Sequence, residues 1–207
     1  MKFARAWASL WVCLAGSCAA VSSAQDPFEF DPGVYPESMG GLVTTIGISQ
    51  MNAPGWEPLD YPTYVGVGYQ QRTEWDPLEL ELAFHYNHDV AGGGLTPLER
   101  LRFFVMDLGL GMALPLTEGR TGTLEPYVGG GMSFLYARRD EEAGFAVDHF
   151  RDGDMGWYGH AGIRIHLDRV RYISVDWRWL RDVEVDLGRG IQSAESDTLS
   201  VGFGYSF

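Results

Sequence analysis

The last nine residues, LSVGFGYSF at positions 199–207, alternate strictly between bulky apolar and small side chains. Leu199, Val201, Phe203, Tyr205 and Phe207 fall on one parity, while serine and glycine occupy the other. Successive side chains of a β-strand point to opposite faces. The stretch therefore predicts a strand that turns its large side chains toward one environment and its small ones toward another.

The same period of two recurs along most of the chain. Each segment is close to the roughly 9–11 residues that a tilted strand needs to cross a bilayer. No helix of ordinary length is predicted between neighbouring segments, so they should pair as antiparallel hairpins. The eight predicted strands are residues 41–51, 61–71, 77–87, 100–114, 123–137, 155–167, 170–181 and 197–207.

The predicted connections alternate in length. The long ones are residues 52–60, 88–99, 138–154 and 182–196, and the short ones are 72–76, 115–122 and 168–169. Long loops at one end and short turns at the other are typical of transmembrane β-barrels. We expect the long loops to be solvated and able to act as a recognition surface.

Volume decides which parity faces outward. One parity is bulky and apolar, as at Leu78, Leu80, Leu82 and Phe84, and the other is small or charged. The interior of an eight-stranded barrel is just wide enough for side chains to fill it. Eight strips of Leu, Phe and Trp would overfill that interior, which argues against a soluble barrel. The predicted fold is all-β, an eight-stranded antiparallel up-and-down transmembrane β-barrel over residues 41–207.

Charged side chains occupy the inward parity of four predicted strands. Isolated charges are costly in a low-dielectric interior, so we expect these groups to pair and plug the lumen. A continuous ion path, and hence a narrow passive pore, is the alternative. The predicted lumen network comprises Glu79, Glu81, Asp107, His160, Arg164, His166, Asp176 and Arg178.

Residues 1–24 have the features of a cleavable signal peptide. Lys2 and Arg5 precede an apolar run, and the small residues SSA follow before Gln25. The stretch LAGSC leaves open whether Cys18 is lipidated. Residues 25–40 contain three prolines without a period and predict an irregular lead.

Composition excludes one class of partner. The formal net charge is −13, and all 28 acidic residues lie beyond position 24. Such a chain would be repelled by the phosphates of nucleic acid.

The alternating final strand that ends in Phe207 resembles the C-terminal assembly signal of bacterial outer-membrane β-barrel proteins. Phe203, Tyr205 and Phe207 are the residues that carry this resemblance. The eight strands are similar to the small barrels of the outer membrane protein A transmembrane domain and the outer membrane protein X family. The resemblance implies a monomer in the outer membrane of a Gram-negative cell, in contact with lipid and lipopolysaccharide and inserted by the barrel assembly machinery.

Catalytic, cofactor and metal sites are not predicted. FHYNHD, at residues 84–89, partly resembles the motif of a lipid A deacylase, but Asn87 stands where that motif has serine. His160 and His166 are six residues apart on one strand, roughly 20 Å, which is too far to share a metal. A lipid A-modifying enzyme that uses His85 or His88 remains the second hypothesis.

Four arginines with outward parity lie near the ends of the predicted strands. Arginine binds phosphate through a bidentate fork of hydrogen bonds. We therefore predict lipopolysaccharide contacts at Arg100, Arg102, Arg138 and Arg181. The first hypothesis for the whole chain is a non-enzymatic envelope protein with a structural or surface-interaction role.

Overall fold

The computed structural model describes residues 40–53, 56, 61–73, 75, 77–93, 96–114, 124–143, 146–168 and 170–207. They all belong to one compact unit, Val34–Phe207. The predicted signal peptide and the lead up to residue 39 lie outside the described residues. Gly40, predicted as the last residue of the lead, begins the first strand.

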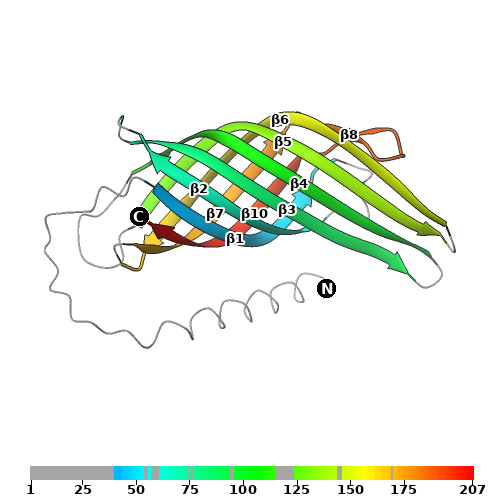
Figure 1. The fold of residues 1–207 in the computed structure, drawn as a ribbon, viewed down its shortest axis with the longest axis horizontal. Helices are drawn as coiled ribbons and strands as arrows, with labels where there is room; N and C mark the ends of the chain where they lie inside the picture. The colour runs from blue at the N-terminus through cyan, green and yellow to red at the C-terminus, as the bar shows by residue number, and fades with distance from the viewer. Residues whose placement is uncertain are drawn as a thin grey trace, which may run out of the picture. The chain divides into compact units, whose positions relative to one another are not determined.

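Eight antiparallel strands close into a barrel, which confirms the predicted fold class (Figure 1). Around the barrel the order is β1, β10, β7, β6, β5, β4, β3 and β2, so neighbours in sequence are neighbours in space. Only the pairing of β1 with β10 joins distant parts of the chain. The barrel strands are β1 (Gly40–Met51), β2 (Thr63–Arg72), β3 (Leu78–Gly93), β4 (Thr96–Ala113), β5 (Leu124–Ala143), β6 (Ala146–His166), β7 (Arg171–Arg181) and β10 (Ser196–Ser206).

The first and last strands seal the barrel along their whole length. Their register runs from Gly41 opposite Ser206 to Met51 opposite Ser196. At the end of this seam, the Gly40 N–H donates to the Phe207 carbonyl at 3.2 Å, and the Phe207 N–H donates to the Gly40 carbonyl at 2.9 Å. Closure leaves no unpaired edge within the barrel body, which is what hydrocarbon surroundings require.

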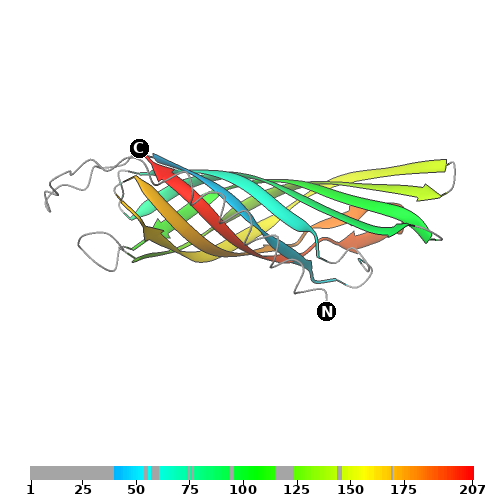
Figure 2. The same cartoon turned by 90° about the horizontal axis from the view of Figure 1, so that it is seen from below.

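Four consecutive strands, β3 to β6, are much longer than the others and form a long wall. β5 and β6 have 20 and 21 residues, whereas β2 has 10. About ten residues suffice to cross a bilayer, so roughly half of β5 and β6 projects beyond it. Figure 2 shows this wall extending past the ends of the other strands. We call this the outer end of the barrel, and the end that holds Phe207 the inner end.

The long wall corrects two predicted loops. Residues 88–99 and 138–154 were expected to be solvated connections, but nearly all of them lie within β3 to β6. Consequently His88 and His149, expected in loops, lie on strands. The polar residues there conceal the strand signal, because a sheet outside the membrane can be charged on its outer face.

The connection between β7 and β10 is also not an open loop. It contains the hairpin of β8 (Glu184–Asp186) and β9 (Ile191–Ser193). Asp182, with φ of 57°, turns the chain out of β7. β8 is held beside β6 by hydrogen bonds from its backbone to side chains of β6. The Glu184 N–H donates to Asp154 and the Asp186 N–H donates to Asp152, both at 2.8 Å.

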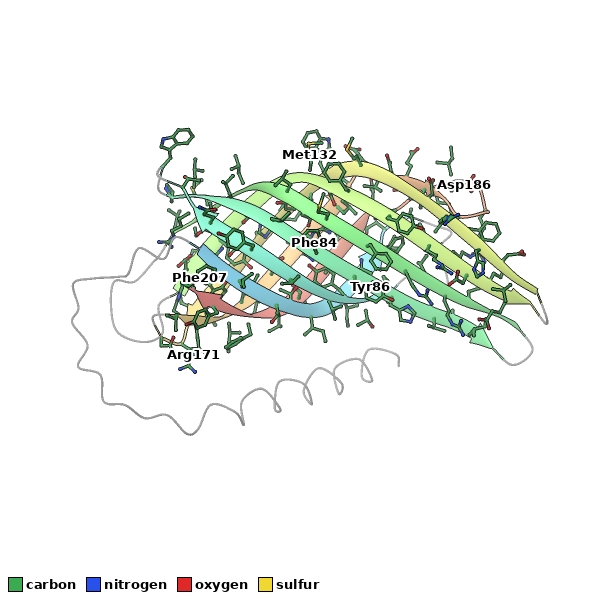
Figure 3. The ribbon with its side chains drawn as sticks, in the orientation of Figure 1. Phe84, Tyr86, Met132, Arg171, Asp186 and Phe207 are labelled. Carbon is green, nitrogen blue, oxygen red and sulfur yellow. The ribbon has the colours of Figure 1, made fainter. Side chains whose placement is uncertain are left out.

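The outer surface of the barrel is apolar, as predicted for a lipid-facing wall. Leu108 is 55% exposed and Trp177 is 54% exposed. Phe84 and Met132 lie on this surface, while Phe207 lies at the inner end (Figure 3). Phe203, Tyr205 and Phe207 are exposed along the outside of the closing seam. In the part of the chain that the structure describes, no helix is long and apolar enough to cross a membrane.

Candidate functional site: the lumen and the outer rim

The central ionic cluster of the lumen joins β4 to β7. Arg178 donates from Nε to Asp107 Oδ2 and from Nη2 to Asp107 Oδ1, each at 2.7 Å. The same carboxylate lies 2.9 Å from Nε2 of His85, whose Nδ1 lies 2.5 Å from the Tyr64 hydroxyl. Both charged partners are buried, and their bidentate geometry compensates for the desolvation of each.

A second ionic cluster lies toward the inner end. Arg164 donates from Nη2 to Glu79 at 2.8 Å and from Nη1 to Glu125 at 2.7 Å. His166 Nε2 lies 2.8 Å from the other oxygen of Glu125. Arg72, at the mouth of the barrel, lies within ion-pair distance of both carboxylates. Glu125 is absent from the predicted network although it shares the inward parity of β5.

His160 is the centre of the third cluster. Its Nε2 lies 2.8 Å from Glu81 and its Nδ1 lies 3.0 Å from Asp176. The Tyr127 hydroxyl also donates to Asp176, at 2.8 Å. The structure thus brings all eight predicted lumen residues into three adjacent clusters.

Glycines on the inward parity make room for these side chains. A Cβ atom at Gly129 would overlap the imidazole of His160, and one at Gly204 would overlap the ring of Tyr172. The inward tyrosines were not predicted as lumen residues. Their position among glycine and charged residues on the same parity is the signal that could have identified them: Tyr64, Tyr127, Tyr158 and Tyr172.

Little space remains between the clusters. A cavity of about 70 Å³ lies in the middle of the barrel, lined by residues such as His85, His160 and Arg178. A second, of about 40 Å³, lies at the inner end beside Arg72 and His166. The second cavity is lined mainly by polar groups and could hold water bound to them.

The outer half of the lumen is mainly apolar, which corrects the expectation that the inward parity is small or charged throughout. Above Asp107, the inward residues of β4 are Val105, Phe103 and Leu101, all buried. The β8–β9 hairpin covers them from the other side. We call this set the apolar plug: Met51, Trp56, Leu101, Phe103, Val105, Leu135, Ala137, Tyr158, Leu180, Val183, Val185, Leu187 and Ala194.

Trp56, from the connection between β1 and β2, packs into the apolar plug. Its ring contacts Phe103 edge-on, with centroids 5.5 Å apart. Its indole N–H donates to the Ser193 carbonyl of β9 at 2.7 Å. Arg139 of β5 adds a hydrogen bond, donating from Nη1 to the Leu187 carbonyl at 3.0 Å. The hairpin is thus bound to the wall by apolar packing and by hydrogen bonds.

The histidines of FHYNHD do not form one site. His85 faces the lumen, where it contacts Tyr64 and Asp107. His88 has the opposite parity on β3, and its Nδ1 lies 3.2 Å from the Leu101 carbonyl. In the described ranges, no group of three or more His, Cys, Asp or Glu residues is placed to hold a metal ion.

The four outward arginines fall into two separate places. Arg100 pairs with Glu142 at 2.5 Å, while Arg102 and Arg138 share Asp140 at 3.3 and 2.8 Å. These three lie on β4 and β5, at the outer rim. Arg181 lies on β7, where it pairs with Asp197 at 2.8 Å. The structure therefore does not bring Arg181 together with the others.

Comparison with solved structures finds small outer-membrane barrels. Neisserial surface protein A aligns with a TM-score of 0.59 at 10% identity, covering 82% of this chain and 98% of that one. Ail, the attachment invasion locus protein of Yersinia pestis, aligns with a TM-score of 0.56 at 11% identity, covering 83% and 100%. OprG of Pseudomonas aeruginosa gives 0.53 at 16%, covering 84% and 99%.

No curated protein sequence matches this chain. The model of the outer membrane protein beta-barrel domain family matches residues 10–207. The match extends over nearly the whole chain, and the closed eight-stranded barrel agrees with it. The chain belongs to the outer membrane protein beta-barrel domain family, and its place is the outer membrane.

Proposed function

We propose that this protein is a non-enzymatic outer-membrane barrel with a plugged lumen that acts through its outer end. The apolar plug above the ionic clusters is the observation that carries the proposal. A water-filled pore needs a continuous polar path, whereas this lumen is filled first by ion pairs and then by packed apolar side chains.

The outer end is the part of the molecule free to meet other molecules. The long wall and the β8–β9 hairpin project past the other strands and present charged side chains on a rigid sheet. One of the aligned solved structures is Ail in complex with the heparin analogue sucrose octasulfate. That ligand is bound by Ail, and for this chain the shared fold supports a role in binding other molecules.

The biogenesis of the protein follows from the same proposal. Residues 1–24 would direct export, and Phe203, Tyr205 and Phe207 would be read by the barrel assembly machinery. The folded monomer would then lie among outer-membrane lipid and lipopolysaccharide, with the outer end facing outward.

Conductance in planar lipid bilayers tests the plugged lumen. We expect the purified barrel to give no stable single-channel current. A variant in which residues 183–194 are replaced by a short glycine–serine linker should leak, because Val183, Val185, Leu187 and Ala194 are removed from the apolar plug. Steady conductance of the unmodified protein would contradict the proposal and favour a narrow pore.

Incubation with lipid A tests the non-enzymatic part. We expect the lipid A mass spectrum to be unchanged after incubation with the barrel. Loss or gain of an acyl chain, abolished by His85→Gln or His88→Gln, would instead support the lipid A-modifying enzyme.

A further inference from the structure

The outer face of the long wall carries three arginines and one histidine in a cross-strand row. His88 lies opposite Arg102, Arg102 opposite Arg138, and Arg138 opposite Arg151, on β3, β4, β5 and β6. We call these four residues the cationic row. Like charges directly opposite each other destabilise a sheet. A row of this kind is therefore a place where a bound anion would stabilise the wall.

The charge of the row is only partly balanced by protein groups. Asp140 is shared by Arg102 and Arg138, and it also lies 2.7 Å from Nδ1 of His149. Arg151 has no ion pair with any residue that the structure describes. Three guanidinium groups thus face one carboxylate, which leaves an excess of positive charge on an exposed surface.

The position of the row indicates which anion it meets. Two residues closer to the bilayer on the same strands lie Tyr86, Phe104 and Tyr136, which are also cross-strand neighbours. Their ring centroids are 5.1 and 6.3 Å apart. Such a band of aromatic side chains marks the membrane–water interface of a transmembrane barrel. The cationic row therefore lies at the level of lipid headgroups.

From this juxtaposition we infer that Arg102, Arg138 and Arg151 form a binding site for a phosphate group on the headgroup of an outer-leaflet glycolipid, such as lipid A. Guanidinium groups match phosphate oxygens through bidentate hydrogen bonds. The aromatic side chains beneath would pack against the sugar or the first methylene groups of the lipid. This site deepens the proposed surface role and rests on it. It also replaces the predicted four-arginine clasp, since Arg181 lies opposite Trp157, six residues or roughly 20 Å along β6 from Arg151.

The test is titration of the purified full-length barrel in detergent with bisphosphorylated lipid A. The triple variant Arg102→Gln, Arg138→Gln, Arg151→Gln should bind at least about tenfold more weakly. The matched control is Arg171→Gln, Arg181→Gln, Arg189→Gln, which removes the same charge from arginines paired with Asp168, Asp197 and Glu99. The control should bind like the unmodified protein, and dephosphorylated lipid A should not distinguish the variants.

Two further single variants keep the test independent of folding. Arg151→Gln breaks no ion pair with a described residue and should still weaken binding several-fold. Asp140→Asn removes the competing carboxylate and should tighten binding. Heat-dependent migration on SDS gels verifies that each variant retains a closed barrel.

Equal binding by the triple variant and its control would overturn the inference. Equally tight, arginine-dependent binding of inositol hexaphosphate would overturn the lipid assignment and identify a site for soluble polyanions. Neither result depends on conductance, so the proposal of a plugged lumen is tested independently of this site.

Discussion

The inner and outer halves of the lumen are built on the same strands but filled by opposite means. On β4, Asp107 enters an ionic cluster, while Leu101 and Phe103, on the same face, enter the apolar plug. The difference lies in what stands across the lumen. Asp107 meets Arg178 of the opposite wall, whereas Leu101 and Phe103 meet the β8–β9 hairpin and Trp56. The parity of a residue decides whether its side chain faces the lumen, and the element across the lumen decides whether a charged or an apolar side chain is stable there.

The strongest way to break the inner half is to remove one partner of its central ion pair. Arg178→Met leaves Asp107 buried without its cation and should cost about 3–5 kcal/mol of unfolding free energy. Urea titration of the barrel in lipid vesicles, followed by tryptophan fluorescence, measures this cost.

The double variant Arg178→Met, Asp107→Leu provides the control. It should recover much of the loss, because no unpaired charge remains buried. If the double variant were as unstable as the single one, the cost would arise from packing and not from charge.

The outer half should respond to lost volume. Leu101→Ala opens a cavity in the apolar plug and should cost about 3 kcal/mol in the same titration. Leu108→Ala, on the lipid-facing side of β4, is the matched control and should cost less, because lipid fills the space. Equal costs for the two variants would mean that the plug is not closely packed.

Overfilling the inner half should have a moderate effect. Gly204→Ala places a methyl group against the ring of Tyr172 and should cost about 1–3 kcal/mol. Gly41→Ala lies on the neighbouring strand, where the nearest heavy atom would be 3.4 Å from the new Cβ. That control should be nearly neutral, and a similar cost at both glycines would point to a general effect of the substitution.

The smallest expected effect is the response of the hairpin to acid. The backbone N–H groups of Asp186 and Gly153 lower the pKa of Asp152 below its ordinary value of 3.8. The stabilisation is fully present above that value and is lost as the pH falls through the lower, folded pKa. Hydrogen exchange of residues 183–194 should therefore accelerate in this acidic range.

Asp152→Asn should show most of that acceleration already at pH 7. Asp148→Asn, on the same strand, should behave like the unmodified protein. An unchanged exchange rate of the hairpin in Asp152→Asn would show that the apolar plug alone holds it.

The lumen network shows how much of a site can be predicted from the sequence. Parity placed Glu79, Asp107 and Arg178 inside, and the cost of burying lone charges implied that they pair. Which residues pair depends on strand tilt and on what lies across the barrel. For that reason the participation of Glu125 and of the inward tyrosines in the lumen network was not predicted.

The sequence by itself determined the number of strands in the barrel, the faces they present and the outer-membrane class, because a period of two is a local property of an extended backbone. Tertiary structure alone decided the long wall, the apolar plug and the cationic row. Residues 138–143 and 146–154 pair as strands because a neighbouring strand is already in register beside them. The arginines of the row become one charged surface only because the register of three neighbouring strands places them opposite one another.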